Sequence, residues 1–157
     1  MNSFISSHRQ KIDARFNKVS SISDPADQGE WSRYLCILVS GYIEESLRIL
    51  LETYAVKNAS PYIQNFVCKE IKGITNCKTN KIIDILGKFH SDWGTNFISQ
   101  IAAKSNIDNE IKDSIDSIVT TRHAIAHGKS VGVSYSTVSN YYKNVKKAVE
   151  VLENIIS

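Results

Sequence analysis

The segment from Arg122 to Gly128, Arg-His-Ala-Ile-Ala-His-Gly, holds the side chains with the clearest chemistry in this chain. An arginine guanidinium grips a phosphate with a fixed fork of donors and keeps its charge throughout the physiological pH range. A histidine side chain gives or takes a proton near neutral pH. Arg122 and His127 together therefore supply the groups needed to cleave RNA without a metal ion.

A helix expected from about Ile107 to His127 must position these side chains, and Gly128 suits a left-handed cap at its end. Arg122 falls in line with the apolar stripe of this helix, where an unpaired guanidinium would cost several kcal/mol. We therefore expect Arg122 to have a ligand or a buried partner such as Glu44 or Glu45. The apolar stripe consists of Ile107, Ile111, Ile115, Ile118 and Ile125.

The spacing of the motif predicts a site shared between two chains. At roughly 100° per residue, Arg122 and His127 lie roughly 140° apart around the helix axis, whereas His123 and His127 share a face. One protomer alone makes a poor active site. Two copies packed about a two-fold axis would bring both residues of both chains into one cleft, and a symmetric dimer is the commonest oligomer. We expect a homodimer.

The rest of the chain also reads as helical, without a convincing strand. We expect helices over Ser3 to Val19 (with Phe4, Ile12 and Phe16 as apolar anchors), Glu30 to about Lys57, Pro61 to Ile71, from a cap at Thr79 to Phe89, around Trp93 to Ile101, and through Val138 to Ile156. The second of these carries two adjacent apolar stripes and should be central to the core. The last should pack antiparallel to the motif helix. The prediction is one domain over residues 1–157, all-α, a helical bundle with a long core helix pair and additional short helices.

Composition narrows the function classes. A chain of 157 residues with 42% hydrophobic and 22% charged residues is typical of one globular domain. Three cysteines without Cys-x-x-Cys pairing favour neither a disulfide framework nor a zinc cluster. The polar N-terminus and the absence of a long apolar run predict a cytoplasmic protein without a membrane span. The net charge is only +3, yet five lysines cluster between residues 69 and 88 (Lys69, Lys72, Lys78, Lys81 and Lys88), either as a solvated face or as a phosphate-binding stripe.

Other chemistries find little support. His123 and His127 have the spacing of zinc ligands, but Ala124 stands where a metalloprotease needs glutamate. No nucleophile elbow and no phosphate-binding loop occurs. Glu44 and Arg48 are four residues apart, as in a surface or interface ion pair. His127 has a structural alternative too, because a histidine at a helix end bonds the last carbonyls favourably.

The motif resembles that of the HEPN-domain ribonucleases, in which an arginine and a histidine separated by four to six residues lie near the end of a late helix. Arg122 and His127 match the four-residue form, with the polar His123 after the arginine and Gly128 after the histidine. The architecture around residues 31–54 and 107–156 fits the HEPN-like bundle. The chain looks most similar to the compact, stand-alone type, like RiboL-PSP-HEPN, found in toxin–antitoxin and antiviral systems.

The resemblance implies a metal-independent RNA endonuclease, needing no cofactor, with Arg122 and His127 as catalytic residues in a homodimer. We expect His123, Lys129, Glu45 and Arg48 to support or position the RNA substrate. A toxin or defence role implies an antitoxin or regulatory partner. The alternative is a non-catalytic module of the same fold that binds a nucleotide or a partner protein such as a nucleotidyltransferase antitoxin.

Overall fold

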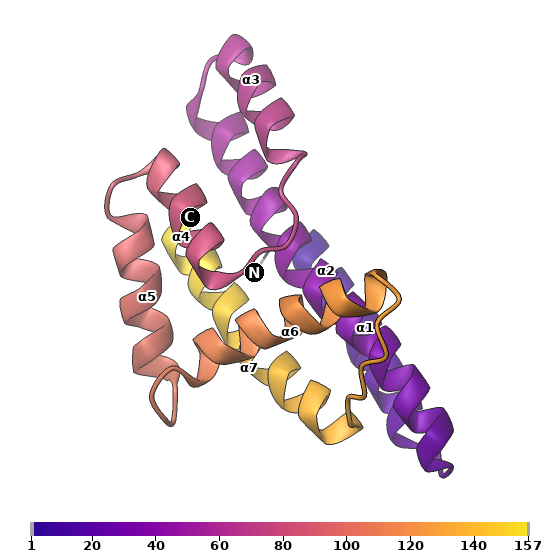
Figure 1. The fold of residues 1–157 in the computed structure, drawn as a ribbon. Helices are drawn as coiled ribbons and strands as arrows, with labels where there is room; N and C mark the ends of the chain where they lie inside the picture. The colour runs from indigo at the N-terminus through magenta and orange to yellow at the C-terminus, as the bar shows by residue number, and fades with distance from the viewer. Residues whose placement is uncertain (1, 157) are drawn as a thin grey trace.

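Seven helices and no strand make up residues 2–156, the part of the chain that the computed structural model describes (Figure 1). They are α1 (Ser3–Ser20), α2 (Pro25–Asn58), α3 (Pro61–Ile71), α4 (Thr79–Phe89), α5 (Trp93–Lys104), α6 (Glu110–Ala126) and α7 (Tyr135–Ile156). The all-α class and the bundle architecture are thereby confirmed. Within these residues, no helix combines the length and the apolar character that crossing a bilayer requires.

The 34-residue helix α2 is the central element of the bundle, as its two apolar stripes predicted. It packs against α1, α3, α6 and α7, and α7 in turn packs against α5 and α6. Its inward side chains have no exposed surface, and each such leucine or isoleucine contributes about 1.5–3 kcal/mol when fully buried. These residues are Leu35, Val39, Ile43, Leu47 and Leu51.

Helix α2 begins five residues earlier than the sequence pattern indicated, at Pro25 rather than Glu30. The Asp24 side chain accepts a hydrogen bond from the Asp27 N–H at 2.9 Å, and Pro25 takes the first helical position, where a missing N–H costs nothing. Pro25 to Gly29, which lie between the first two helices that we expected from the sequence, therefore belong to α2.

Two predicted apolar anchors lie on the surface instead. Phe4 is 73% exposed, and Ile5 beside it is buried in its place. Ile107 is 71% exposed because α6 begins only at Glu110, after a left-handed Asn109 with φ of 62°. The Glu110 carboxylate accepts the Asn106 N–H at 2.8 Å and closes this turn. The other stripe isoleucines at 111, 115 and 118 are fully buried.

Helices α6 and α7 pack against each other, but their axes cross in Figure 1 and so are not antiparallel as expected. A buried hydrogen bond from Asn144 Nδ2 to Ser114 Oγ (2.9 Å) joins them. The early part of α7 reaches α1, where the Tyr142 ring stacks on Phe16 at 4.6 Å between centroids. Helix α7 thus packs against α1, α2, α5 and α6 at different points along its length.

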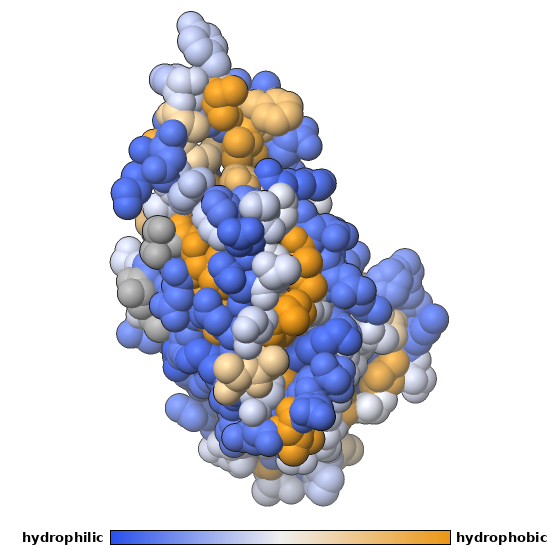
Figure 2. All heavy atoms as spheres, turned by 90° about the vertical axis from the view of Figure 1, so that its left-hand side faces the viewer, coloured by the Kyte–Doolittle hydropathy of each residue, from blue (hydrophilic) through white to orange (hydrophobic). Residues whose placement is uncertain are grey.

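Helix α3 packs on α2 and keeps apolar side chains in solvent, among them Tyr62, Ile63 and Phe66. Figure 2 shows apolar atoms gathered at the upper end of the molecule, the end where α3 lies in Figure 1. The apolar pattern of Pro61 to Ile71 therefore predicted the helix correctly, although only Ile71 is buried.

The start of α4 is attached to α6. Thr79, which we expected to cap α4, is instead its first residue, and its N–H donates to Asp116 Oδ1 at 2.7 Å. An acceptor from another helix thus takes the place of a local cap.

Replacing Asp116 by Ala should lower the free energy of unfolding by about 0.5–2 kcal/mol, the usual cost of losing a capping acceptor. Chemical denaturation measures this difference. Asp84→Ala on the exposed face of α4 is the matched control and should stay close to the wild type. Equal effects of the two substitutions would contradict the role given to Asp116.

Candidate active site at the end of helix α6

Helix α6 ends where the motif predicted, in a glycine cap that fixes the direction of the following chain. The Gly128 N–H donates to the Ile125 carbonyl and the Lys129 N–H to the Ala124 carbonyl, both at 3.0 Å. This pair of bonds is a Schellman motif, and it requires a left-handed residue at Gly128, whose φ is 71°. The cap holds His127 at the exposed end of the helix.

His123 and His127 lie on one exposed face, as their spacing predicted. Their ring centroids are 4.3 Å apart and the rings are tilted by 56°. Two imidazoles at this separation can contact the same phosphate or the same attacking group. Among residues 2–156 no set of three or more His, Cys, Asp or Glu side chains is placed to hold a metal ion.

Arg122 is half-buried, and its partner is an asparagine rather than a carboxylate. Its Nη1 donates to Asn76 Oδ1 at 3.2 Å. Within the described residues, neither Glu44 nor Glu45 forms an ion pair with it, so the direct pairing considered from the sequence is wrong. Because an amide is neutral, the guanidinium keeps its full charge for an anionic ligand.

Glu44 supports Arg122 indirectly, through Asn76. Its side chain is buried, with 7% exposed surface, and Oε1 accepts the Asn76 backbone N–H at 2.7 Å. Asn76 has a φ of 52°, a left-handed conformation that asparagine tolerates better than most residues. A carboxylate on α2 thus holds the loop residue that positions the guanidinium on α6.

A small hollow opens beside this arrangement. It has a volume of about 260 Å³ and is lined by Asn76, Lys78, Val119, Thr120 and His123. Among these residues, Lys78 belongs to the lysine cluster between residues 69 and 88, so this cluster reaches α6 at the hollow. Asn76 was not among the site residues predicted from the sequence. The one sequence feature that could have pointed to it is its place in a polar loop before α4.

The remaining predicted supporting residues lie in two places. Glu45 and Arg48 form an ion pair with each other on α2, so Arg48 pairs with Glu45 rather than with Glu44 as the spacing suggested. Lys129 is exposed just after the cap, and its backbone N–H takes part in the cap itself. Of these three, Lys129 is the one that lies close to the histidine in the chain.

The reactivity of the Cys77 thiol can report on whether the loop around Asn76 stays packed on α2, because Cys77 directly follows Asn76 and is buried. Burial raises the pKa of its thiol to about 12, the Glu44 charge acts in the same direction, and Lys81 and Arg48 act in the opposite direction. A buried neutral thiol reacts slowly with alkylating agents because the thiolate is the nucleophile.

Opening this loop should therefore expose Cys77. We expect Glu44→Ala to accelerate alkylation of Cys77 at mildly alkaline pH for two reasons. The Asn76 N–H loses a charged acceptor, a bond worth about 1.5–3 kcal/mol, and the thiol loses a neighbouring negative charge that raises its pKa. Peptide mass spectrometry measures the labelling of each cysteine. Cys36, which is also buried, serves as the internal control. Parallel acceleration at Cys36 and Cys77 would indicate global unfolding and contradict a local role for Glu44.

Comparison with known proteins agrees with the motif. A family model described as RiboL-PSP-HEPN matches residues 4–157, which includes α2 to α7 and nearly all of α1. Neither the curated proteins nor the solved structures gave a significant match. The family suggests ribonuclease activity of the metal-independent kind and the binding of RNA. The chain belongs to the RiboL-PSP-HEPN family.

Proposed function

We propose that this protein is a metal-independent RNA endonuclease whose catalytic residues are Arg122 and His127. The observation that carries the proposal is the state of Arg122, a half-buried guanidinium held by the neutral Asn76 on the same helix end that carries the exposed His123 and His127. A purely structural arginine would be expected to pair with a carboxylate, and Glu44 is close enough to hold the backbone of Asn76. The positive charge is instead left available for a phosphate.

The reaction is an attack within the RNA chain. The 2′-hydroxyl oxygen forms a bond to the adjacent phosphorus while the bond from that phosphorus to the 5′ oxygen of the next nucleotide breaks. The products are a 2′,3′-cyclic phosphate and a 5′-hydroxyl. His127 takes the proton of the attacking hydroxyl or gives one to the leaving oxygen. Arg122 orients the phosphate and offsets the charge that builds on its non-bridging oxygens.

The site is completed by a second copy of the chain. One protomer supplies one His127, whereas the reaction needs both a proton acceptor and a proton donor. In a two-fold cleft, His127 accepts the proton, and either the partner's His127 or solvent donates one to the leaving oxygen. His123 lies 4.3 Å from His127 between ring centroids, which suits it to bond the imidazole or the phosphate.

Nearby cations would draw RNA to this cleft. Lys78 lines the hollow beside His123, and Lys129 follows the glycine cap. Exposed lysines raise the local concentration of a polyanion and contribute a salt-dependent part of its binding. Glu45 and Arg48, which pair with each other on α2, remain candidates for positioning the RNA substrate. A toxin or antiviral defence role, restrained by an antitoxin or regulatory protein, is the biological setting that we propose.

Purified protein should cleave single-stranded RNA in the presence of EDTA. His127→Ala should lower the rate about 10²–10⁴-fold, the usual contribution of general acid–base catalysis. Arg122→Gln should also lower it, because phosphate orientation and charge stabilisation are removed. Gel electrophoresis of labelled RNA measures the rate, and Lys104→Ala on the exposed end of α5 is the control that should retain activity. Intact RNA with a folded dimer would instead favour the binding module of the same fold.

Mixing two inactive variants tests the shared site. When Arg122→Ala and His127→Ala proteins are unfolded together and refolded, a mixed dimer brings one Arg122 and one His127 into the same cleft. We expect partial recovery of cleavage relative to either variant alone, because the two chains complement each other. If each chain held a self-contained site, the mixture would be as inactive as its components.

A further inference from the structure

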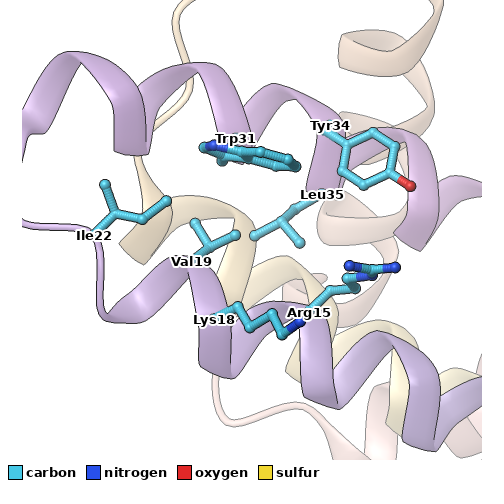
Figure 3. Close-up of a pocket in the computed structure, with 7 residues that line it drawn as sticks. All are labelled: Arg15, Lys18, Val19, Ile22, Trp31, Tyr34 and Leu35. Carbon is cyan, nitrogen blue, oxygen red and sulfur yellow. The ribbon is translucent and has the colours of Figure 1, made fainter.

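A second cavity lies away from the motif, between α1 and the beginning of α2 (Figure 3). It has a volume of about 260 Å³, and no acidic residue lines it. Its lining residues are Arg15, Lys18, Val19, Ile22, Trp31, Tyr34 and Leu35. The proposed cleavage chemistry uses none of them.

One wall of this cavity is aromatic and open to solvent. The Trp31 side chain is 49% exposed and Tyr34 is 41% exposed, with ring centroids 5.9 Å apart in an edge-to-face arrangement. In Figure 3 the Trp31 ring lies above Leu35 and Val19, which give it an apolar support. Large apolar surface of this kind, left in water beside a cavity, is typical of a binding site.

The opposite wall is cationic, and its charges are unpaired. Figure 3 shows the Arg15 and Lys18 side chains across the cavity from Trp31, with the Arg15 guanidinium near Tyr34. Within residues 2–156, Arg15 is the one arginine without a polar partner, since the other four pair with a carboxylate or, for Arg122, with Asn76. Lys18 forms no ion pair within this part of the chain either. Two adjacent unpaired cations favour an anionic ligand.

We propose that this cavity binds one nucleotide of a single-stranded RNA, with its base stacked on Trp31 and its phosphate held by Arg15 and Lys18. A nucleotide combines a flat aromatic base, whose face can stack on an indole, with an anion a few ångströms away, and the two walls of the cavity suit these two groups. An acidic peptide would satisfy the cations and leave the indole face without a partner. Base stacking tolerates every base, so the site would add affinity with little sequence preference.

The cationic face continues along α1. Lys11, Arg15 and Lys18 follow one another at intervals of four and three residues, which places them on one face of the helix with roughly 5–6 Å between neighbouring Cβ atoms. All three are exposed. The phosphate backbone of a bound strand would therefore run beside α1.

This surface connects to the motif through the chain itself. The segment after Gly128 leads to α7, whose first residue, Tyr135, donates its hydroxyl to the Phe16 carbonyl at 3.3 Å. Phe16 directly follows Arg15, so the α6–α7 loop extends from the motif to the helix that carries the cations. The inference concerns binding alone and stands whether or not the protein cleaves RNA.

Tryptophan fluorescence tests the proposal. In a Trp93→Phe background, Trp31 is the remaining tryptophan, and a short 2′-O-methyl oligoadenylate, which lacks the attacking hydroxyl, should quench it in a saturable way. Trp31→Leu keeps an apolar side chain on Leu35 and should weaken binding, measured by fluorescence anisotropy of a labelled oligonucleotide, by roughly 5- to 150-fold. The double variant Arg15→Gln and Lys18→Gln should weaken it too and lower the slope of log K against log salt by about 0.7 for each phosphate that is no longer neutralised.

The matched control is Lys57→Gln with Lys104→Gln, which removes the same charge from exposed positions elsewhere. Equal reductions of affinity in the two double variants, or affinity unchanged by Trp31→Leu, would overturn the proposal. Quenching of Trp31 that depends on the protein concentration and not on the oligonucleotide concentration would also overturn the proposal. It would indicate that a second copy of the chain covers this surface. Retained oligonucleotide binding by Arg122→Gln and His127→Ala proteins would support it independently of cleavage.

Discussion

The hydrogen bond from the Asn76 backbone to Glu44 is the interaction on which the candidate active site depends. It ties the loop before α4 to the central helix, and through the Asn76 side chain it sets the position of the Arg122 guanidinium. A buried carboxylate is costly unless its oxygens are bonded, so the loop and Glu44 stabilise each other. Arg122 gains a fixed position without losing its charge, which is what phosphate binding requires.

Helix α2 links this site to the second proposed binding surface. Its middle carries Glu44 behind the motif, and its first turns carry Trp31 and Tyr34 against α1. Both surfaces are thus held by one helix, whose inward face is the central part of the core. Because α2 supports both surfaces, this helix would set the distance between them for an RNA strand that contacts both.

Local patterns predicted the helices better than their ends and their contacts. Apolar residues at helical spacing identified every segment from α1 to α7, and Gly128 marked the end of α6, because periodicity and capping act over a few neighbouring residues. The start of α2 was missed because an Asp-Pro pair reads equally well as a loop. The partner of Arg122 was missed because Asn76 lies 46 residues away, and no local pattern reports on a contact brought about by packing. Phe4 was misplaced because apolar character alone does not say which face a helix buries, and Ile107 was misplaced because α6 begins only at Glu110, beyond it.

The nature of the cut ends tests the central claim most directly. RNA treated with the protein in EDTA, and with a matched strand bearing 2′-deoxy sugars as control, can be analysed by mass spectrometry of the fragments. Attack by the 2′-hydroxyl under the control of Arg122 and His127 predicts 2′,3′-cyclic phosphate and 5′-hydroxyl ends, and an intact deoxy strand. Fragments with 5′-phosphate ends, or cleavage of the deoxy strand, would contradict the account.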